Sequence, residues 1–280
     1  MLWRGRQGSS NVEDRRGISG GGLAVGGGIG GIIIAILYSL LGGDASNIPE
    51  LLPGQQAAGK QYNAEQSAAD DTLAQFVSVV LKDTEDVWGN LMSNYQKPTL
   101  VMFTDGVQSA CGSASAAVGP FYCPGDEKVY IDISFFHDLK ERFGAPGDFA
   151  MAYVIAHEVG HHIQKLTGTS DKVHSLQQRS GEREGNKLSV QLELQADFLA
   201  GVWANRAQEM KGILQPGDIE EALTAANAIG DDRLQQESQG RVVPDAFTHG
   251  TSAQRMYWFK KGYQTGDVNQ GNTFDDPDLQ

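Results

Sequence analysis

Apolar residues recur along this chain mainly at the three- and four-residue spacing that is typical of amphipathic helices. This spacing predicts helices at residues 64–93, 148–166, 187–208, 218–229 and 252–261. Two short apolar runs, each bounded by Pro, Gly or Asp, predict strands at 99–103 and 128–133. We therefore expect one α+β domain of about 200 residues, mainly helical with a small sheet.

The N-terminal region departs from this pattern with a continuous apolar run. Residues 23–41 carry no charge, and at about 1.5 Å per residue they just reach across a hydrocarbon core of about 30 Å. Arginines precede the run, which predicts a cytoplasmic segment (1–22), one transmembrane helix (23–41) and a domain outside the cytoplasm, held at the inner membrane. A glycine-rich flexible linker is the alternative. A cleaved signal peptide is less favoured, because no good cleavage site follows the run.

Composition sets the remaining boundaries. Residues 42–63 are rich in Pro, Gly, Gln and Ala and are predicted to be a linker, so the folded domain is expected at 64–265. Residues 167–186 are predicted to form a long loop between two helices. The acidic residues 266–280 are predicted to be a disordered tail.

Charge and cysteine content agree with an extracytoplasmic domain. The net charge is −13, and no basic patch indicates a nucleic-acid partner. The two cysteines, Cys111 and Cys123, lie in a Gly/Ser/Ala segment that has no regular periodicity. In an oxidising compartment we expect them to form a disulfide. Two reduced thiols and a metal pair are the alternatives, but no second Cys/His pair at structural-zinc spacing supports the metal pair.

The predicted helix 148–166 contains the sequence His157-Glu158-Val159-Gly160-His161-His162. Residues four apart on a helix differ by about 40° and share a face, so His157 and His161 can bind one metal ion. His162 lies about 140° from His157 and is not expected to be a ligand. Glu158 is placed to take a proton from water at the open position of a zinc ion, as in zincins. The alternative is a surface helix with incidental histidines.

A catalytic zinc needs three protein ligands and one open position. The best candidate for the third ligand is Glu193, in the predicted helix 187–208. Asp197 follows four residues later on the same face, so one carboxylate can bind metal while the other holds a ligand histidine through its free ring N–H. An exposed acidic pair is the alternative.

Two further residues are candidates near the C-terminus. His249 could donate a hydrogen bond to the oxyanion that forms during hydrolysis, or it could merely precede the cap of the helix that begins at Thr251 or Ser252. Arg255, one turn into that helix, could pair with Asp197 or Glu193, although an exposed arginine is the commoner outcome.

These motifs resemble those of the bacterial putative neutral zinc metallopeptidase family, membrane-anchored proteins that are similar to gluzincins. The resemblance covers nearly the whole chain and rests on residues 11–16, 111–114, 119–124, 129–132, 157–161, 193–197 and 249–255. It implies a zincin-like fold and Zn²⁺ as the cofactor. It also implies His157, His161 and Glu193 as ligands, Glu158 as the general base and Asp197 beside a ligand. Gly250 differs from the proline that the related CAAX-type proteases often have there.

The function expected from these residues is a zinc-dependent endopeptidase of the cell envelope that hydrolyses peptides or proteins. In zincins an edge strand above the active-site helix binds the peptide, and Val129, Tyr130 and Ile131 are our candidates for it. An ordinary paired strand is the alternative. Two other functions are kept open: an anchored binding or chaperone-like module with structural zinc, and a zinc amidohydrolase for a non-peptide envelope substrate.

Overall fold

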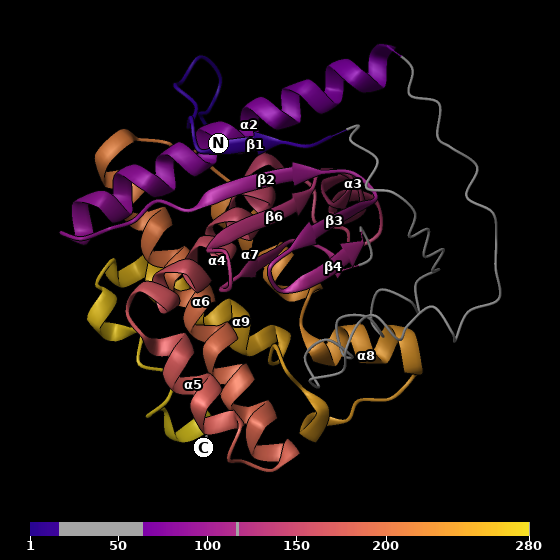
Figure 1. The fold of residues 1–280 in the computed structure, drawn as a ribbon, viewed down its shortest axis with the longest axis vertical. Coiled ribbons are helices and arrows are strands. Elements are labelled where there is room, and N and C mark those ends of the chain that lie inside the picture. The colour runs from indigo at the N-terminus through magenta and orange to yellow at the C-terminus, as the bar shows by residue number, and fades with distance from the viewer. Residues whose placement is uncertain (17–63, 116–117, 280) are drawn as a thin grey trace.

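The computed structural model describes residues 1–16, 64–115 and 118–279 (Figure 1). The helices in this part of the chain are α2 (Ala64–Leu91), α3 (Ser134–Glu141), α4 (Asp148–Leu166), α5 (Thr169–Gln177), α6 (Glu182–Lys211), α7 (Asp218–Ala228), α8 (Asp231–Gln239) and α9 (Ser252–Thr265). The strands are β1 (Val12–Asp14), β2 (Thr99–Phe103), β3 (Gly106–Ser109), β4 (Gly112–Ser115), β5 (Phe121–Cys123) and β6 (Lys128–Asp132). The protein is thus mostly helical with a small sheet, as the apolar spacing predicted.

Helix α4 forms the centre of the core. It contacts α2, α6 and α7 as well as β5 and β6, and most of its circumference is buried. A helix buried on all sides needs apolar residues on all sides, which explains the nearly continuous apolar run that precedes His157. The helix begins and ends where the sequence predicted. Gly147 is its N-cap residue, and Asp148, the first residue of the helix, accepts a hydrogen bond from Trp3 Nε1 at 2.6 Å.

The main sheet has the strand order β1-β2-β6-β5. Strand β2 is parallel to both β1 and β6, whereas β5 is antiparallel to β6. Val129 therefore pairs with Leu100 on one side and with Tyr122 on the other. The prediction of a peptide-binding edge at Val129, Tyr130 and Ile131 is wrong, because β5 already occupies that side of β6. The edge of this sheet that faces α4 is β5.

The predicted disulfide between Cys111 and Cys123 is present, with a Cα–Cα distance of 5.8 Å. It joins the turn between β3 and β4 to the edge strand β5. The first part of the Gly/Ser/Ala segment that showed no periodicity belongs to the antiparallel hairpin β3–β4, so the bridge fastens this hairpin to the sheet.

The N-terminal part of the predicted fold class needs correction. None of the helices in the described part of the chain is both long enough and apolar enough to span a membrane. The apolar run 23–41 and the predicted linker 42–63 lie outside the described residues. The fold class that residues 1–16, 64–115 and 118–279 show is therefore a mainly helical domain with a small sheet, without a membrane-spanning helix among these residues.

Residues 1–16, predicted to be a separate cytoplasmic segment, are packed into the domain. Trp3 is only 4% exposed and its ring meets Phe76 of α2 edge-on. Strand β1 extends the main sheet beyond β2, and the backbone N–H of Ser9 donates to the carbonyl of Ser78. In Figure 1 the N-terminus and β1 lie beside α2, at the end of the molecule far from the C-terminus. The prediction of a separate segment is wrong because short-range composition does not show this packing.

Two other predicted irregular regions are also structured. Part of the predicted loop 167–186 is helix α5, which packs against α4 and α6. The predicted disordered tail forms two 3₁₀ turns, Val268–Gln270 and Pro277–Leu279. Between them, Thr273 is fully buried and its hydroxyl donates to the carbonyl of Gln191 at 2.6 Å. The tail is ordered because its small and polar residues satisfy specific groups on α6.

Candidate metal centre

Helices α4 and α6 bring two imidazoles and one carboxylate together. His157 and His161 come from α4 and Glu193 from α6, and one ligand atom from each lies within 4.8 Å of the other two. The Nε2 atom of His157 is 3.1 Å from Glu193 Oε2, and the Nε2 atom of His161 is 3.4 Å from Glu193 Oε1. We call these three residues the metal group.

A glycine permits this close approach. Gly160 lies between the two histidines, and a β-carbon there would be 3.0 Å from the carbonyl oxygen of Ala196 on α6. Because glycine has no β-carbon, the backbone of α4 can rest against α6 at this level. The Gly of this motif thus sets the spacing between the two helices that carry the metal group.

Asp197 holds His157 through the ring nitrogen Nδ1, which faces away from the metal group. This fully buried carboxylate is 2.8 Å from His157 Nδ1, and it accepts hydrogen bonds from the Tyr153 hydroxyl at 2.5 Å and from Arg255 Nε at 2.8 Å. Burial would raise the pKa of Asp197, but the charges of Arg255 and His157 lower it to about 2. An ionised Asp197 holds the hydrogen on His157 Nδ1, so the Nε2 lone pair is directed at the metal group. Arg255 is 2% exposed and pairs with Asp197 rather than with solvent.

His161 is held by Gln164, which was not among the predicted site residues. Gln164 Oε1 lies 2.9 Å from His161 Nδ1, and its side-chain nitrogen donates to the carbonyl of Leu192 at 2.7 Å. The signal available in the sequence was a glutamine three residues after a candidate ligand, since residues three apart share a helix face.

Glu158 is 8% exposed beside the metal group. Burial raises its pKa above the ordinary value, although the neighbouring charges of His161 and His157 lower it in part. A carboxyl group whose pKa is moved toward neutrality exchanges protons more readily near neutral pH than an ordinary glutamate does.

His249 lies close enough to Glu193 for each charge to shift the pKa of the other. Asp231, at the start of α8, holds it: Asp231 Oδ2 accepts from the His249 backbone N–H at 2.6 Å, and Oδ1 is 3.2 Å from His249 Nδ1. Burial would lower the pKa of His249, but Asp231 and then Glu193 raise it overall. Thr251 caps α9, so His249 also precedes the cap. Asp231 was not among the predicted site residues. The sequence offered one sign of it, an aspartate directly after Gly230, and this does not point to a contact with His249.

His162 is fully buried and turned away from the metal group. Its Nδ1 atom is 3.0 Å from the Tyr122 hydroxyl of β5, and its Nε2 atom is 2.6 Å from the carbonyl of Gln96. Burial lowers its pKa. Both ring nitrogens are engaged elsewhere, which agrees with its predicted place outside the ligand set.

The donor set fits a catalytic zinc ion. Two imidazole nitrogens and one carboxylate are a known catalytic zinc ligand set. Each histidine faces an acceptor at Nδ1, Asp197 in one case and Gln164 in the other, which leaves both Nε2 atoms available as ligands.

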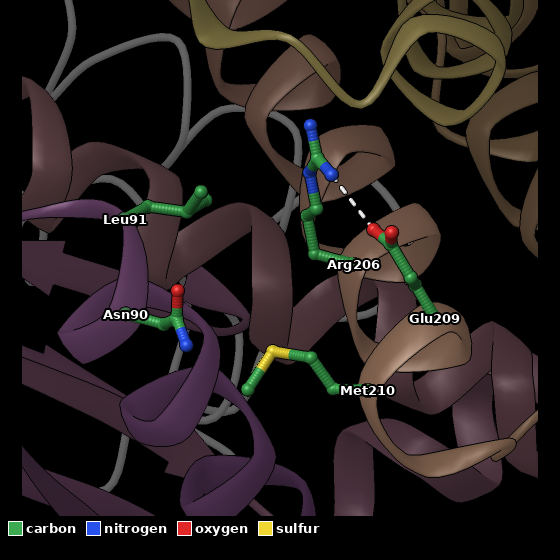
Figure 2. A pocket seen from close by; sticks show the side chains of 5 residues that line it. All are labelled: Asn90, Leu91, Arg206, Glu209 and Met210. Atoms are coloured by element: carbon green, nitrogen blue, oxygen red, sulfur yellow. Dashed lines mark hydrogen bonds and ion pairs between the residues drawn. The ribbon is translucent and has the colours of Figure 1, made fainter.

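A separate pocket of about 310 Å³ lies at the C-terminal ends of α2 and α6. Its lining is Asn90, Leu91, Arg206, Glu209 and Met210, and Figure 2 shows the ion pair between Arg206 and Glu209 at 2.7 Å. No residue of the metal group lines it, so it has no direct part in chemistry at that group.

Comparison with known proteins agrees with this geometry. A family model described as putative neutral zinc metallopeptidase matches residues 1–274. The chain is 51% identical over 284 residues to the uncharacterized protein YpfJ of Escherichia coli (strain K12), covering 98% of this chain and 99% of that protein. It is 45% identical over 203 residues to the uncharacterized protein Rv2575 of Mycobacterium tuberculosis, covering 69% and 68%. No solved structure matches the chain.

Proposed function

The chain belongs to the putative neutral zinc metallopeptidase family, and on that premise we propose that it is a zinc-dependent endopeptidase whose ligands are His157, His161 and Glu193. The observation that carries the proposal is the convergence of these three side chains within 4.8 Å. Glu158 lies on the same helix, directly after the first ligand. A purely structural zinc site has no need of a carboxylate beside an open position.

The residues around the metal group have distinct tasks in peptide hydrolysis. Zinc, when bound, supplies a Lewis acid that activates water and polarises the substrate carbonyl. Glu158 accepts a proton from the attacking water and passes it to the nitrogen of the leaving amine. His249, oriented by Asp231, donates a hydrogen bond to the oxyanion that forms on the substrate carbonyl.

We place the substrate peptide along β5 instead of β6. Strand β5 is at the edge of the main sheet and contacts α4, and an edge strand can pair with an extended peptide. Tyr122 of β5 is tied to His162 of α4, so this edge is held directly against the helix that carries the metal ligands.

We also propose that the domain works in an oxidising compartment outside the cytoplasm. The disulfide between Cys111 and Cys123 supports this location, because such bridges persist where thiols are not kept reduced.

The test is a comparison of the purified wild-type protein with Glu158→Gln. We expect the wild type to bind one zinc and to cleave members of a peptide library. Glu158→Gln should keep its zinc and lose activity by about 10²–10⁴-fold, because the proton acceptor is gone. Glu184→Gln is the matched control, since this glutamate is exposed on α6 and lies 3.8 Å from Lys187 in a surface ion pair.

Full activity in Glu158→Gln, or a wild type without zinc, would overturn the proposal. A wild type that binds zinc and cleaves neither peptides nor proteins would instead favour the binding module or the non-peptide amidohydrolase.

A further inference from the structure

Gln164 connects the metal group to a chain of hydrogen-bonded amide groups. Its side chain is nearly inaccessible, at 1% exposure. Besides facing His161 Nδ1, it donates from Nε2 to the carbonyl of Leu192 at 2.7 Å and to Gln195 Oε1 at 3.1 Å. Both partners belong to α6, so Gln164 links the second ligand of α4 to the helix that supplies Glu193.

The direction of these bonds is determined by the carbonyl groups at their ends. A backbone carbonyl can only accept, so the amide nitrogen of Gln164 must face Leu192 and its oxygen must face His161. An oxygen beside His161 Nδ1 requires the hydrogen on that atom. The lone pair of His161 is then on Nε2, the atom that faces Glu193.

The C-terminal segment determines the orientation of the next amide. Gln195 Nε2 donates to the carbonyl of Gly271 at 3.0 Å, and this carbonyl too can only accept. The oxygen of Gln195 therefore faces Gln164. Gly271 lies tightly against α6, because a β-carbon there would be 2.3 Å from the ring of Phe198. Two residues later, the buried Thr273 is bonded to the carbonyl of Gln191.

We propose that Gly271, Gln195 and Gln164 form a positioning relay for His161. The C-terminal segment orients Gln195, Gln195 and Leu192 orient Gln164, and Gln164 sets the tautomer and ring orientation of His161. The relay thereby sets how tightly the metal group binds zinc. This inference rests on the proposed function in taking zinc as the ion.

The relay differs from the support of the other ligand histidine. His157 is held by the ionised Asp197, whose own partners are the buried Tyr153 and Arg255. His161 is held by a neutral amide, which adds no second negative charge beside Glu193. A neutral amide can present either its oxygen or its nitrogen, so its orientation has to come from partners further away.

The test is the zinc dissociation constant, measured by competition with a chromogenic chelator on the full chain. Gln164→Met keeps the length of the side chain but removes the acceptor, and we expect zinc affinity to fall by about 10–100-fold. Gln195→Met and Gly271→Ala should each weaken zinc binding measurably but by less than about tenfold, because the Leu192 carbonyl still orients Gln164.

Gln191→Met is the matched control. Gln191 is also a buried glutamine of α6 that bonds the C-terminal segment, through the carbonyl of Leu279, but it is not bonded to Gln164. Its zinc affinity should equal that of the wild type. The thermal midpoint of each zinc-free variant is measured in parallel, because a merely structural role lowers that midpoint without changing zinc affinity.

Unchanged zinc affinity in Gln164→Met would overturn the relay, as would equal losses in Gln191→Met and Gln195→Met. If Gln164→Met does not fold, Gln195→Met and Gly271→Ala decide the question, and wild-type affinity in both would overturn the relay. A wild type without zinc would overturn both the relay and the proposed function. Full peptidase activity in Glu158→Gln, with zinc bound, would remove the proposed function alone.

Discussion

At the scale of single residues, the charges around the metal group are arranged in two pairs, one buried and one partly exposed at His249. Asp197 pairs with Arg255 and also contacts His157, and Asp231 pairs with His249, whose charge acts on Glu193. Each carboxylate accepts several hydrogen bonds, which offset the cost of burying its charge. The two pairs differ in purpose, since the first holds a ligand and the second orients a proposed hydrogen-bond donor.

His249→Ala should lower kcat by about 10²–10³-fold, because an oxyanion donor is removed.

Asp231→Asn tests the orientation of that donor. Asp231 raises the pKa of His249, so the protonated donor persists to higher pH in the wild type. In Asp231→Asn the negative charge is gone, so the pKa of His249 falls. The alkaline limb of the plot of kcat against pH should then move to lower pH. An unmoved limb in Asp231→Asn would contradict this role. His174→Ala, on the surface of α5, is the control.

Asp197→Asn should lower the free energy of unfolding by about 3–5 kcal/mol, because Arg255 is left buried without its counter-charge. The pKa of Asp197 is about 2 in the folded protein, below its usual 3.8. Its stabilisation is therefore present above the unfolded pKa and is lost as the pH falls toward 2. Urea denaturation of the metal-free proteins at several pH values measures the difference, which should shrink in acid. Asp171→Asn, at an exposed ion pair with Lys165, should change stability by less than about 1 kcal/mol.

At the scale of elements, helices α6 and α9 meet backbone to backbone through a pair of glycines. A β-carbon on Gly201 would lie 2.1 Å from the carbonyl oxygen of Phe259, and one on Gly262 would lie 2.0 Å from that of Phe198. This contact brings Arg255 of α9 to Asp197 of α6. The position of one helix against the other thus sets the ion pair behind the metal group.

Gly201→Ala should therefore destabilise the protein by about 1–3 kcal/mol, because the helices must separate. Gly185→Ala is the control in the same helix, since a β-carbon at Gly185 meets open space. There the better helix propensity of alanine should stabilise by about 0.5–1 kcal/mol. Urea denaturation measures both. Equal effects of the same sign would contradict the proposed role of the glycine pair.

A helix or strand could be predicted where its own residues carry a periodic apolar pattern, and was missed where they do not. Helix α4 and strand β2 begin and end where the apolar spacing predicted, because one face or both must be buried. The hairpin β3–β4 and helix α5 were missed, since their Gly, Ser and Gln residues carry no periodic signal. Strand β6 was predicted at the right residues but with the wrong neighbours, because strand pairing depends on the rest of the sheet.

At the scale of the whole molecule, the first residues of the chain complete the domain. Trp3 packs on Phe76 of α2 and bonds to Asp148 at the start of α4. The N-terminal residues therefore brace two helices of the core, one of which carries the metal ligands.

Trp3→Ala should lower the free energy of unfolding by about 3–5 kcal/mol, because a buried indole is removed and a cavity is left. Leu2→Ala is the neighbouring control: Leu2 is 52% exposed, and its truncation should cost less than about 0.5 kcal/mol. Thermal or urea unfolding of the full chain measures both. Equal stability of Trp3→Ala and the wild type would mean that residues 1–16 do not belong to the folded domain.

The sequence by itself determined the features that depend on local geometry. The four-residue spacing of His157 and His161 places both on one helix face, and Glu193 with Asp197 repeats that spacing on a second helix. The two cysteines left one possible intrachain disulfide. The tertiary structure alone decided the packing of residues 1–16, the interior place of β6, the pairing of Asp231 with His249 and the amide chain behind His161. These features join residues far apart in the chain, and their contacts depend on how the helices and strands pack, which no local pattern records.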